Sequence, residues 1–292
     1  MKKRKNNIEK TMSIFLGIIV IFFMIMENMN TKEVPKTETI PVINVEEKFQ
    51  IYYFDVGQAD SALLVNNGKT MLIDAGNNED GEKVVQNIKE LGIEKIDVVV
   101  GTHAHEDHIG GLDDVIDNFE IGNIYLSAAT TTTKTFEDVL DSIAEKNLRI
   151  IVPSVGDRIQ FGDVSCTVKS VDDNSNDLNN SSIVLNVMYG KCSFLFMGDL
   201  ESNMENKITW ESTTVLKVGH HGSDTSSSKY FLKQTLPKYA IISVGEGNSY
   251  NHPSEDTLSR LRSTGARIYR TDENGTIKVI SDGEKVKIET EK

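Results

Sequence analysis

The sequence predicts an α/β protein in which two β-sheets pack face to face with helices on both outer faces, a four-layer αββα sandwich. Strand-like segments occur in two groups along the 292 residues, and each group is framed by segments with helical periodicity. A hydrophobic content of 38% is enough for a sizeable core. No internal repeat of fixed period is visible, so we expect one domain.

The first group of elements fills the chain from residue 49 to residue 119. The turn 66–68 (Asn-Asn-Gly) predicts a β-hairpin. Helical periodicity places Val84, Val85, Ile88 and Leu91 on one face of the first helix. In chain order we expect strands at 49–56, 61–66 and 70–73, a helix at 80–91, a strand at 96–100 and a helix at about 110–119.

The second group is richer in strands and contains a polar loop at 172–180, which is long enough to border a site. It begins with a helix at 136–146 and strands at 149–152, 158–161, 164–171, 182–189 and 192–197. It continues with a helix at 201–210, a strand at 214–218, a helix at 226–235, a strand at 239–243, a helix at 254–263 and strands at 267–269, 276–280 and 285–288.

The N-terminal segment 1–27 has a basic start followed by an uncharged, mostly apolar run at 12–26. Fifteen residues are fewer than the roughly 20 of a spanning helix, but they fit a secretory apolar region. No small-x-small cleavage site follows, so we expect an uncleaved signal-anchor in the cell membrane with an extracellular domain. A cleaved signal peptide, which would give a secreted protein, and a buried helix remain alternatives. Residues 28–48, polar and with two prolines, predict a linker to the domain at 49–292.

Charge and cysteine content limit the possible partners. The formal net charge is −13, so a polyanionic substrate would need a local basic or metal-rich patch. Cys166 and Cys192 lie in strand-like segments without metal-ligand spacing, which predicts buried apolar thiols. A disulfide between them stays open.

All six histidines fall at three short places, and this distribution is typical of a metal site. The first place reads Thr-His-Ala-His-Glu-Asp-His at 102–108, directly after the apolar run 96–100. The other histidines are the pair His220-His221 and the single His252. Histidine suits Zn, Fe, Ni and Cu, and carboxylates extend the possible ions towards Mn.

The spacing predicts how the ligands divide between two neighbouring ions. His103 and His105 are two residues apart in a turn and would face one ion. Asp107 and His108, at the start of the next helix, would face the other. Asp199 follows an apolar strand and would bridge the two ions, although it could instead cap the following helix. Two ions about 3.5–4 Å apart can activate a water and hold the oxygens of an in-line displacement.

We expect His220 to complete the second ion's ligands, although spacing alone does not separate it from His221. Glu106 is expected to point the other way from its neighbours, and to be solvated or to support a ligand from outside. Catalysis would then depend on Asp107, His108 and Asp199.

Further residues are candidates for orienting ligands or binding substrate. Asp74 ends a strand and would orient a ligand, or form a turn. Ser223 would donate a hydrogen bond to a phosphate at a helix start. His252 would contact a leaving group or cap its own turn. Lys217 and His221 belong to the same candidate set, and Arg260, Arg262, Arg267 and Arg270 supply local basic density or ordinary surface charge.

The chain resembles a metallo-β-lactamase-fold hydrolase, because strand-Asp-x-Gly, His-x-His-x-Asp-His, Gly-Asp and a late His occur in that order. It is more similar still to the extracellular hydrolase domain of ComEC-type DNA-uptake proteins. The residues that carry this resemblance are 54–61, 180–185, 217–223 and 269–275. The resemblance covers residues 49–280 and implies metal-dependent hydrolysis of DNA phosphodiesters, with single-stranded DNA as the expected substrate.

One departure from the superfamily pattern affects the first ion. No histidine lies between His108 and His220, where most two-metal members have one. His103, His105 and Asp199 would then be joined by water or by a polar group near 179–182. We therefore expect one or two ions of Zn or Mn. A lactonase or β-lactamase activity and a metal-holding DNA-binding protein without turnover are the alternatives.

Overall fold

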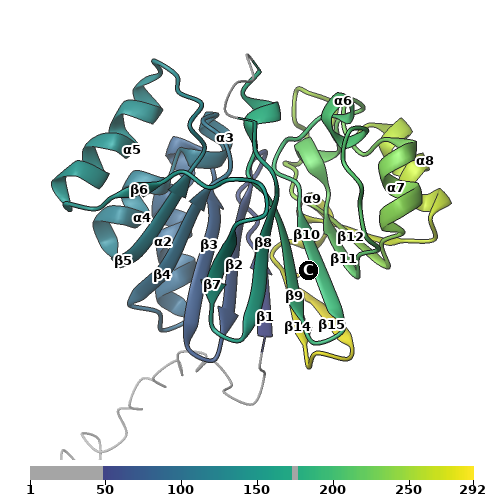
Figure 1. Ribbon diagram of the computed structural model, residues 1–292, viewed down its shortest axis with the longest axis horizontal. Helices are drawn as coiled ribbons and strands as arrows, with labels where there is room; N and C mark the ends of the chain where they lie inside the picture. Colours follow the sequence, from purple (N-terminus) through teal and green to yellow (C-terminus); the bar gives the residue numbers. More distant parts are fainter. Residues whose placement is uncertain (1–48, 173–176) are drawn as a thin grey trace, which may run out of the picture. The chain divides into compact units, whose positions relative to one another are not determined.

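The computed structural model describes residues 49–172 and 177–292, and these form two β-sheets packed face to face (Figure 1). Helices cover the outer face of each sheet, so the predicted αββα sandwich is confirmed. The predicted signal-anchor and linker, residues 1–48, lie outside the described residues. Among the helices of the described ranges, none has the length and apolar character to cross a membrane.

The first sheet has eight strands in the order β15-β14-β1-β2-β3-β4-β5-β6. Its strands are β1 (Phe49–Tyr53), β2 (Ser61–Asn66), β3 (Lys69–Ala75), β4 (Lys95–Gly101), β5 (Glu120–Leu126), β6 (Ile150–Ile151), β14 (Ile277–Ser281) and β15 (Val286–Thr290). Its helices are α2 (Gly81–Glu90), α3 (Glu106–Ile109), α4 (Leu112–Asn118) and α5 (Lys134–Glu145). The chain therefore returns to the first sheet for its last two strands.

The second sheet has seven strands in the order β13-β12-β11-β10-β9-β8-β7. These are β7 (Arg158–Phe161), β8 (Val164–Ser170), β9 (Val184–Tyr189), β10 (Cys192–Phe196), β11 (Val215–Lys217), β12 (Tyr239–Ile242) and β13 (Arg267–Arg270). The accompanying helices are α6 (Ser202–Glu205), α7 (Lys229–Thr235), α8 (Glu255–Ser263) and α9 (Thr271–Asn274). Strands β10 to β13 run parallel, so their carboxyl ends meet at one edge.

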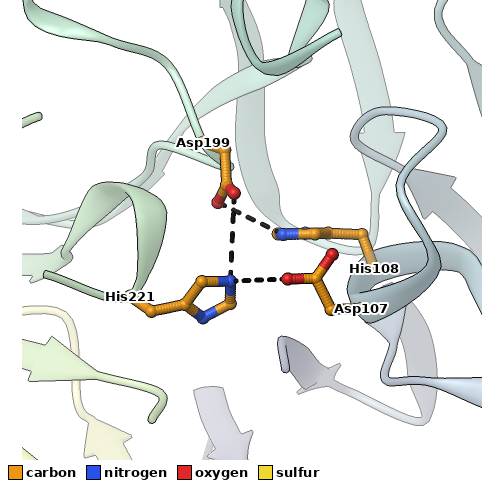
Figure 2. A group of neighbouring side chains, drawn as sticks. All are labelled: Asp107, His108, Asp199 and His221. Carbon is orange, nitrogen blue, oxygen red and sulfur yellow. Dashed lines mark ion pairs between the residues drawn. The ribbon is translucent and has the colours of Figure 1, made fainter. Parts of the chain in front are cut away.

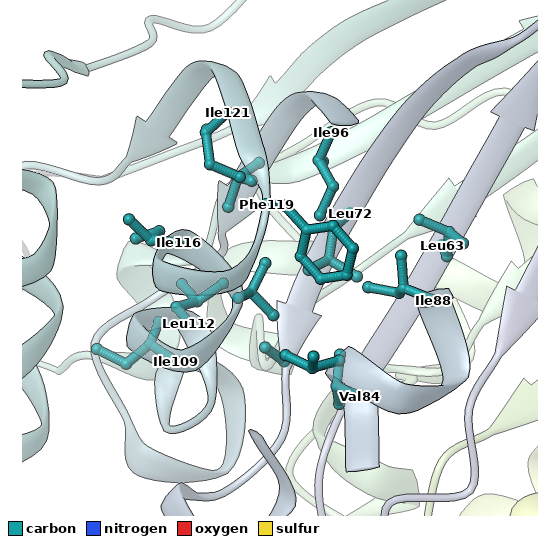
Figure 3. Close-up of a cluster of buried hydrophobic side chains, with 14 of the residues drawn as sticks. Leu63, Leu72, Val84, Ile88, Ile96, Ile109, Leu112, Ile116, Phe119 and Ile121 are labelled. Atoms are coloured by element: carbon teal, nitrogen blue, oxygen red, sulfur yellow. The ribbon is translucent and has the colours of Figure 1, made fainter. Parts of the chain in front are cut away.

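Three apolar clusters separate the four layers. The central cluster joins the sheets, where the ring of Phe49 on β1 packs against Phe161 and Phe194 of the second sheet. A second cluster lies under α2 to α5 (Figure 3). The third lies under α7 and α8. All of β1 is buried because its sheet is covered on both faces, and buried strands lose strict polar alternation.

Several elements differ from the sequence prediction, including the short helix α9, which was not predicted. Strand β5 was not predicted, because Gly122 and Asn123 interrupt its apolar pattern. The helix predicted at about 110–119 is observed as α4, and a separate short helix, α3, precedes it. Gly110 and Gly111 lie between the two helices, where a side chain at Gly110 would meet the backbone of Asn77 and Asn78 and one at Gly111 would meet that of Ala75 and Gly81. The helix predicted at 201–210 stops at residue 205, where the Trp210 indole donates to the Glu205 carbonyl at 2.9 Å.

Candidate metal centre

The candidate site lies at the edge where β3, β4, β10 and β11 end, and both halves of the chain contribute to it. Asp107 and His108 belong to the short helix α3 after β4. Asp199 follows β10, and His221 follows β11. Figure 2 shows the four side chains pointing towards one another.

These four residues offer one donor atom each, and the four atoms lie within 4.8 Å of one another. His108 Nε2 is 3.2 Å from Asp199 Oδ1. His221 Nε2 is 3.2 Å from Asp107 Oδ2 and 3.8 Å from Asp199 Oδ2. Two imidazoles and two carboxylates form a mixed nitrogen and oxygen set that suits a divalent transition metal.

The positions of the neighbouring histidines His220 and His221 depend on a strained backbone conformation. His220 and His221 both have left-handed conformations, with φ of 50° and 51°. Non-glycine residues avoid this region because Cβ crowds the carbonyl, and two in succession cost free energy that the surrounding contacts must offset. The two rings consequently leave the chain in different directions. The pair that spacing could not separate is thus distinguished by geometry, since only His221 lies in the four-residue cluster.

Buried carboxylates orient both histidines of the cluster. His108 Nδ1 donates to Asp74 Oδ2 at 2.8 Å, and Asp74 also accepts from the backbone and hydroxyl of Thr102. His221 Nδ1 donates to the Ser243 carbonyl at 3.0 Å and lies 3.3 Å from Asp60 Oδ1. In each neutral ring the proton is then on Nδ1, so the lone pair of Nε2 faces the cluster.

The cluster contains polar atoms that the fold does not satisfy. Among the described residues, His108 Nε2, His221 Nε2 and Asp199 Oδ1 are buried without a hydrogen-bond partner. Burying such groups unpaired is unfavourable, and most are satisfied in folded proteins. A cation would satisfy all three at once, so the residues present fit a metal ion.

The electrostatics of the cluster follow from close opposite charges. Burial alone would lower the pKa of His221, but the carboxylates of Asp199 and Asp60 outweigh it and raise that pKa to about 10. Burial likewise opposes charge on His108, yet Asp199, Asp74 and Asp107 raise its pKa well above the usual range. Burial would raise the pKa of Asp107, and His108 and His221 instead lower it to about 2.

A second, looser group surrounds the other oxygen of Asp199. Oδ2 is 3.9 Å from His103 Nε2 and 3.6 Å from His220 Nε2. His103 Nε2 is 3.0 Å from His105 Nδ1. The predicted first-ion residues His103 and His105 therefore lie beside the tight cluster, together with His220.

The hydroxyl of Ser182 lies behind this second group. It is 3.3 Å from His103 Nδ1 and accepts a hydrogen bond from the Asp199 backbone at 3.0 Å. Ser182 thus contacts the ring nitrogen of His103 other than the one that faces Asp199, and a polar ligand of the ion from 179–182 stays a prediction.

Asp60 is a site residue that the sequence reasoning did not identify. It is buried, contacts His221, and forms an ion pair with Lys217 at 2.7 Å. Burial would raise the pKa of Asp60, but Lys217 and His221 keep it well below its usual range. The available signal was a charged residue directly before the apolar strand 61–66.

Several residues that were predicted to contact substrate form contacts with other residues of the protein. Lys217 is buried against Asp60, and Ser223 contacts Thr225, whose hydroxyl lies 3.1 Å from His220 Nδ1. Arg260 donates to the carbonyls of 224, 226 and 227. Arg262 pairs with Glu255, and Arg270 pairs with Asp272 and Glu273. Lys217 and Arg260 are thus engaged inside the fold, whereas Arg262 stays exposed in a surface ion pair.

A pocket of about 300 Å³ opens onto the cluster. His252 is half-buried at its wall, with its ring 5.6 Å from that of His220. Glu106 is exposed, as expected, and also lines the pocket. The lining residues are Gln58, His105, Glu106, Asp107, Asn179, Asp199, His220, His221, Tyr250 and His252.

Two packed sheets with a cluster of histidines and aspartates at their common edge define a class of proteins that share this fold and this site. The family model described as the metallo-beta-lactamase superfamily matches residues 54–246. The chain therefore belongs to the metallo-beta-lactamase superfamily, as the sequence resemblance implied. The matched range includes all four cluster residues together with Asp60 and Asp74.

Two curated relatives align with most of this chain. ComE operon protein 3 of Bacillus subtilis is 35% identical over 203 residues, which are 68% of this chain and 26% of that protein. Competence protein ComA of Neisseria gonorrhoeae is 29% identical over 249 residues, 83% of this chain and 33% of that protein. The chain thus spans about a quarter to a third of these relatives' length.

Solved structures support the fold. The metallo-beta-lactamase fold protein YhfI of Bacillus subtilis aligns with a TM-score of 0.52 at 12% identity, covering 82% of this chain and 99% of that one. CmlA, a diiron beta-hydroxylase from Streptomyces venezuelae, aligns with a TM-score of 0.53 at 14% identity, covering 77% and 53%. At such identities these alignments concern architecture alone.

Proposed function

We propose that this protein is a metal-dependent phosphodiesterase that cleaves DNA, with single-stranded DNA as its substrate. The observation that carries the proposal is the open cluster of Asp107, His108, Asp199 and His221, in which buried carboxylates orient both histidines. The competence proteins among the relatives support DNA as the substrate.

Each cluster residue has a definite role in this proposal. His108 and His221 would hold one ion through Nε2, with Asp107 and Asp199 supplying oxygen ligands. His103, His105 and His220 would hold a second ion at Oδ2 of Asp199. A divalent cation at this place supplies Lewis-acid activation of water and of a phosphoryl oxygen. Asp74 and Asp60 hold the two imidazoles in a fixed orientation, with Nε2 of each ring towards the ion.

The nature of the ion follows from the donor set. Imidazole nitrogen suits Zn, and a site rich in carboxylate oxygen also suits Mn. We propose one or two ions of either metal. We further propose that the N-terminal segment anchors the chain in the membrane and that residues 49–292 act outside the cell.

The test uses the purified full chain in detergent, after chelation and reloading with Mn or Zn. We expect cleavage of bis(p-nitrophenyl) phosphate and of single-stranded DNA, lost in Asp107→Ala and His108→Ala. Asp117→Ala, on the exposed side of α4, is the matched control and should retain activity. Hydrolysis of a β-lactam or lactone without phosphodiester cleavage would overturn the proposal. Salt-sensitive DNA binding without turnover would instead identify a metal-holding DNA-binding protein.

A further inference from the structure

A second cavity, of about 630 Å³, adjoins the metal pocket and forms a groove beside it. Gln58, Glu106, Asp107 and Tyr250 line both cavities, so the groove begins at a residue of the metal cluster. Ligand sites in proteins commonly have volumes of about 300–1,000 Å³. The groove is therefore large enough to hold the part of a substrate that extends from the reacting phosphate.

Tyr250 supplies an aromatic surface in this groove. Tyr250 is 67% exposed, so its ring is accessible to a bound molecule. One face stacks on His252 with ring centroids 5.7 Å apart and an interplanar angle of 24°. The loop is held by Asn248, which accepts from the Tyr250 backbone and donates to the Gly245 carbonyl. Tyr250 thus presents a supported ring to the groove.

The groove also offers amide groups with free hydrogen-bonding capacity. Gln58 Oε1 accepts from the Gly245 backbone, and its Nε2 has no partner among the described residues. Asn78 Nδ2 donates to Thr135, and its Oδ1 has no partner in the same part of the chain. One free donor and one free acceptor near an aromatic ring suit the edge and face of a nucleobase.

The charge of the groove limits what else it can hold. Glu79, Asp80 and Glu106 line it, and none of its lining residues is a lysine or arginine. A further phosphate there would meet like charge without a neutralising cation. The groove therefore fits a neutral nucleoside and disfavours a continuing phosphodiester chain.

We propose that this groove is a nucleoside subsite in which Tyr250 stacks on the base next to the reacting phosphate, so that the enzyme acts on the last linkage of a strand. The inference rests on the proposed phosphodiesterase function and narrows its substrate to strand ends and dinucleotides. Tyr250 is a specificity residue in this scheme, and the metal cluster is the reacting centre.

The test compares two substrates with the same leaving group. Thymidine 5′-(p-nitrophenyl phosphate) carries a nucleoside, and methyl p-nitrophenyl phosphate carries a methyl group instead. We expect kcat/KM to favour the nucleoside ester by about tenfold or more in the wild type, because base stacking contributes on that order. Tyr250→Ala should reduce this ratio about tenfold, and Tyr250→Phe should preserve it.

Tyr230→Ala is the matched control, because Tyr230 is also an exposed tyrosine but lies on α7 outside both cavities. It should leave the ratio unchanged. Equal loss of both substrates in Tyr250→Ala would show that the ring acts on the metal centre, and a wild-type ratio near one would remove the subsite. Either result overturns the inference while leaving the phosphodiesterase intact.

Two measurements extend the test beyond these esters. Linear single-stranded DNA should be degraded from an end, and a closed single-stranded circle should resist, whereas equal cleavage of both would overturn the restriction to ends. If neither ester is hydrolysed, the proposed function fails separately. In that case, calorimetric measurement of the affinity for the dinucleotide TpT tests whether the subsite exists. Tyr250→Ala should weaken this affinity about tenfold, and an unchanged affinity would refute the subsite.

Discussion

The neighbouring histidines His220 and His221 have different surroundings, although the sequence presents them as equivalent. The side chain of His221 is 2% exposed and is oriented by Asp60 and the Ser243 carbonyl. The side chain of His220 is 22% exposed and contacts Thr225 and Asp199. The difference follows from the two left-handed residues, which no spacing rule contains.

Substitution should separate the two histidines. We expect His221→Ala to lose the ion at Asp107 and His108 and to lower kcat/KM by more than about 100-fold, because replacing even an outer partner of a ligand costs 10–100-fold. His220→Ala should retain that ion and lose less activity. The metal content of each variant, measured by plasma mass spectrometry, is a second readout that does not depend on activity. Equal metal loss in both variants would contradict the assignment.

Asp60 should act on both stability and metal affinity. Asp60→Asn leaves the buried Lys217 ammonium unpaired, and breaking a buried ion pair costs about 3–5 kcal/mol. It also removes an orienting contact of His221, so metal affinity should fall about 10–100-fold.

The double variant Asp60→Asn, Lys217→Met separates these effects. It should recover much of the lost stability without recovering the affinity, as measured by chemical unfolding and by metal titration. Recovery of both quantities together would mean that Asp60 has only a structural role.

Metal binding should depend on pH in a defined direction. The raised pKa values of His108 and His221 keep these rings protonated at neutral pH in metal-free protein. A cation needs the Nε2 lone pairs, so binding releases protons and affinity rises with pH, by up to about tenfold per unit for each proton released. The rise for His221 should end near pH 10.

Calorimetry in buffers of different protonation enthalpy counts the released protons. The same raised pKa values stabilise the metal-free fold below the pKa of an ordinary histidine, and this stabilisation is lost as pH rises through about 10. Metal affinity that is independent of pH would contradict the assignment of these two ligands.

At the scale of elements, strand β5 shows why a glycine can be required inside a sheet. A Cβ at Gly122 would lie 2.3 Å from the Asp97 carbonyl of the neighbouring strand β4. We expect Gly122→Ala to lower the free energy of unfolding by about 1–3 kcal/mol, the usual cost of overpacking. Ser165→Ala, at an exposed position of β8, is the control and should change it little. Thermal unfolding measures both.

The sequence allowed most elements to be predicted, because periodicity and turn chemistry are local. The hairpin at Asn67-Gly68 has positive φ at both residues, as the asparagine-glycine pair indicates. The elements that were predicted wrongly depend on contacts between residues that are far apart in the sequence. The close approach of Gly122 to β4 and the Trp210 bond that ends α6 are tertiary interactions, and no local pattern records them.

The site was predictable in composition but not in arrangement. Five metal-capable residues at 102–108 indicated a metal, and Asp199 stood after a strand as a bridging ligand would. Asp60 escaped notice because its partners, Lys217 and His221, lie more than 150 residues later in the chain. Only the packing of the two sheets brings these residues together.

At the scale of the whole molecule, the net charge bears on how the proposed DNA substrate would be bound. The net charge is −13, and neither site cavity is lined by a lysine or arginine of the described residues. Phosphate binding should then depend on metal ions and release few counterions. For a dinucleotide we expect KM to change less than about threefold between 50 and 200 mM salt, whereas proteins with 6–10 phosphate contacts lose about 10³–10⁵ in affinity.

A steady-state salt series on TpT measures this dependence. A steep salt dependence would indicate a basic surface elsewhere on the molecule that guides the substrate.

The division of the ligands between the two halves of the chain also bears on biosynthesis. Asp107 and His108 leave the ribosome long before Asp199 and His221. Asp60 likewise has no ion-pair partner until Lys217 has been synthesised. An emerging chain therefore carries an incomplete set of donors for more than a hundred residues. The ion can be captured with full affinity only after both sheets have closed on each other, so metal uptake marks the end of folding.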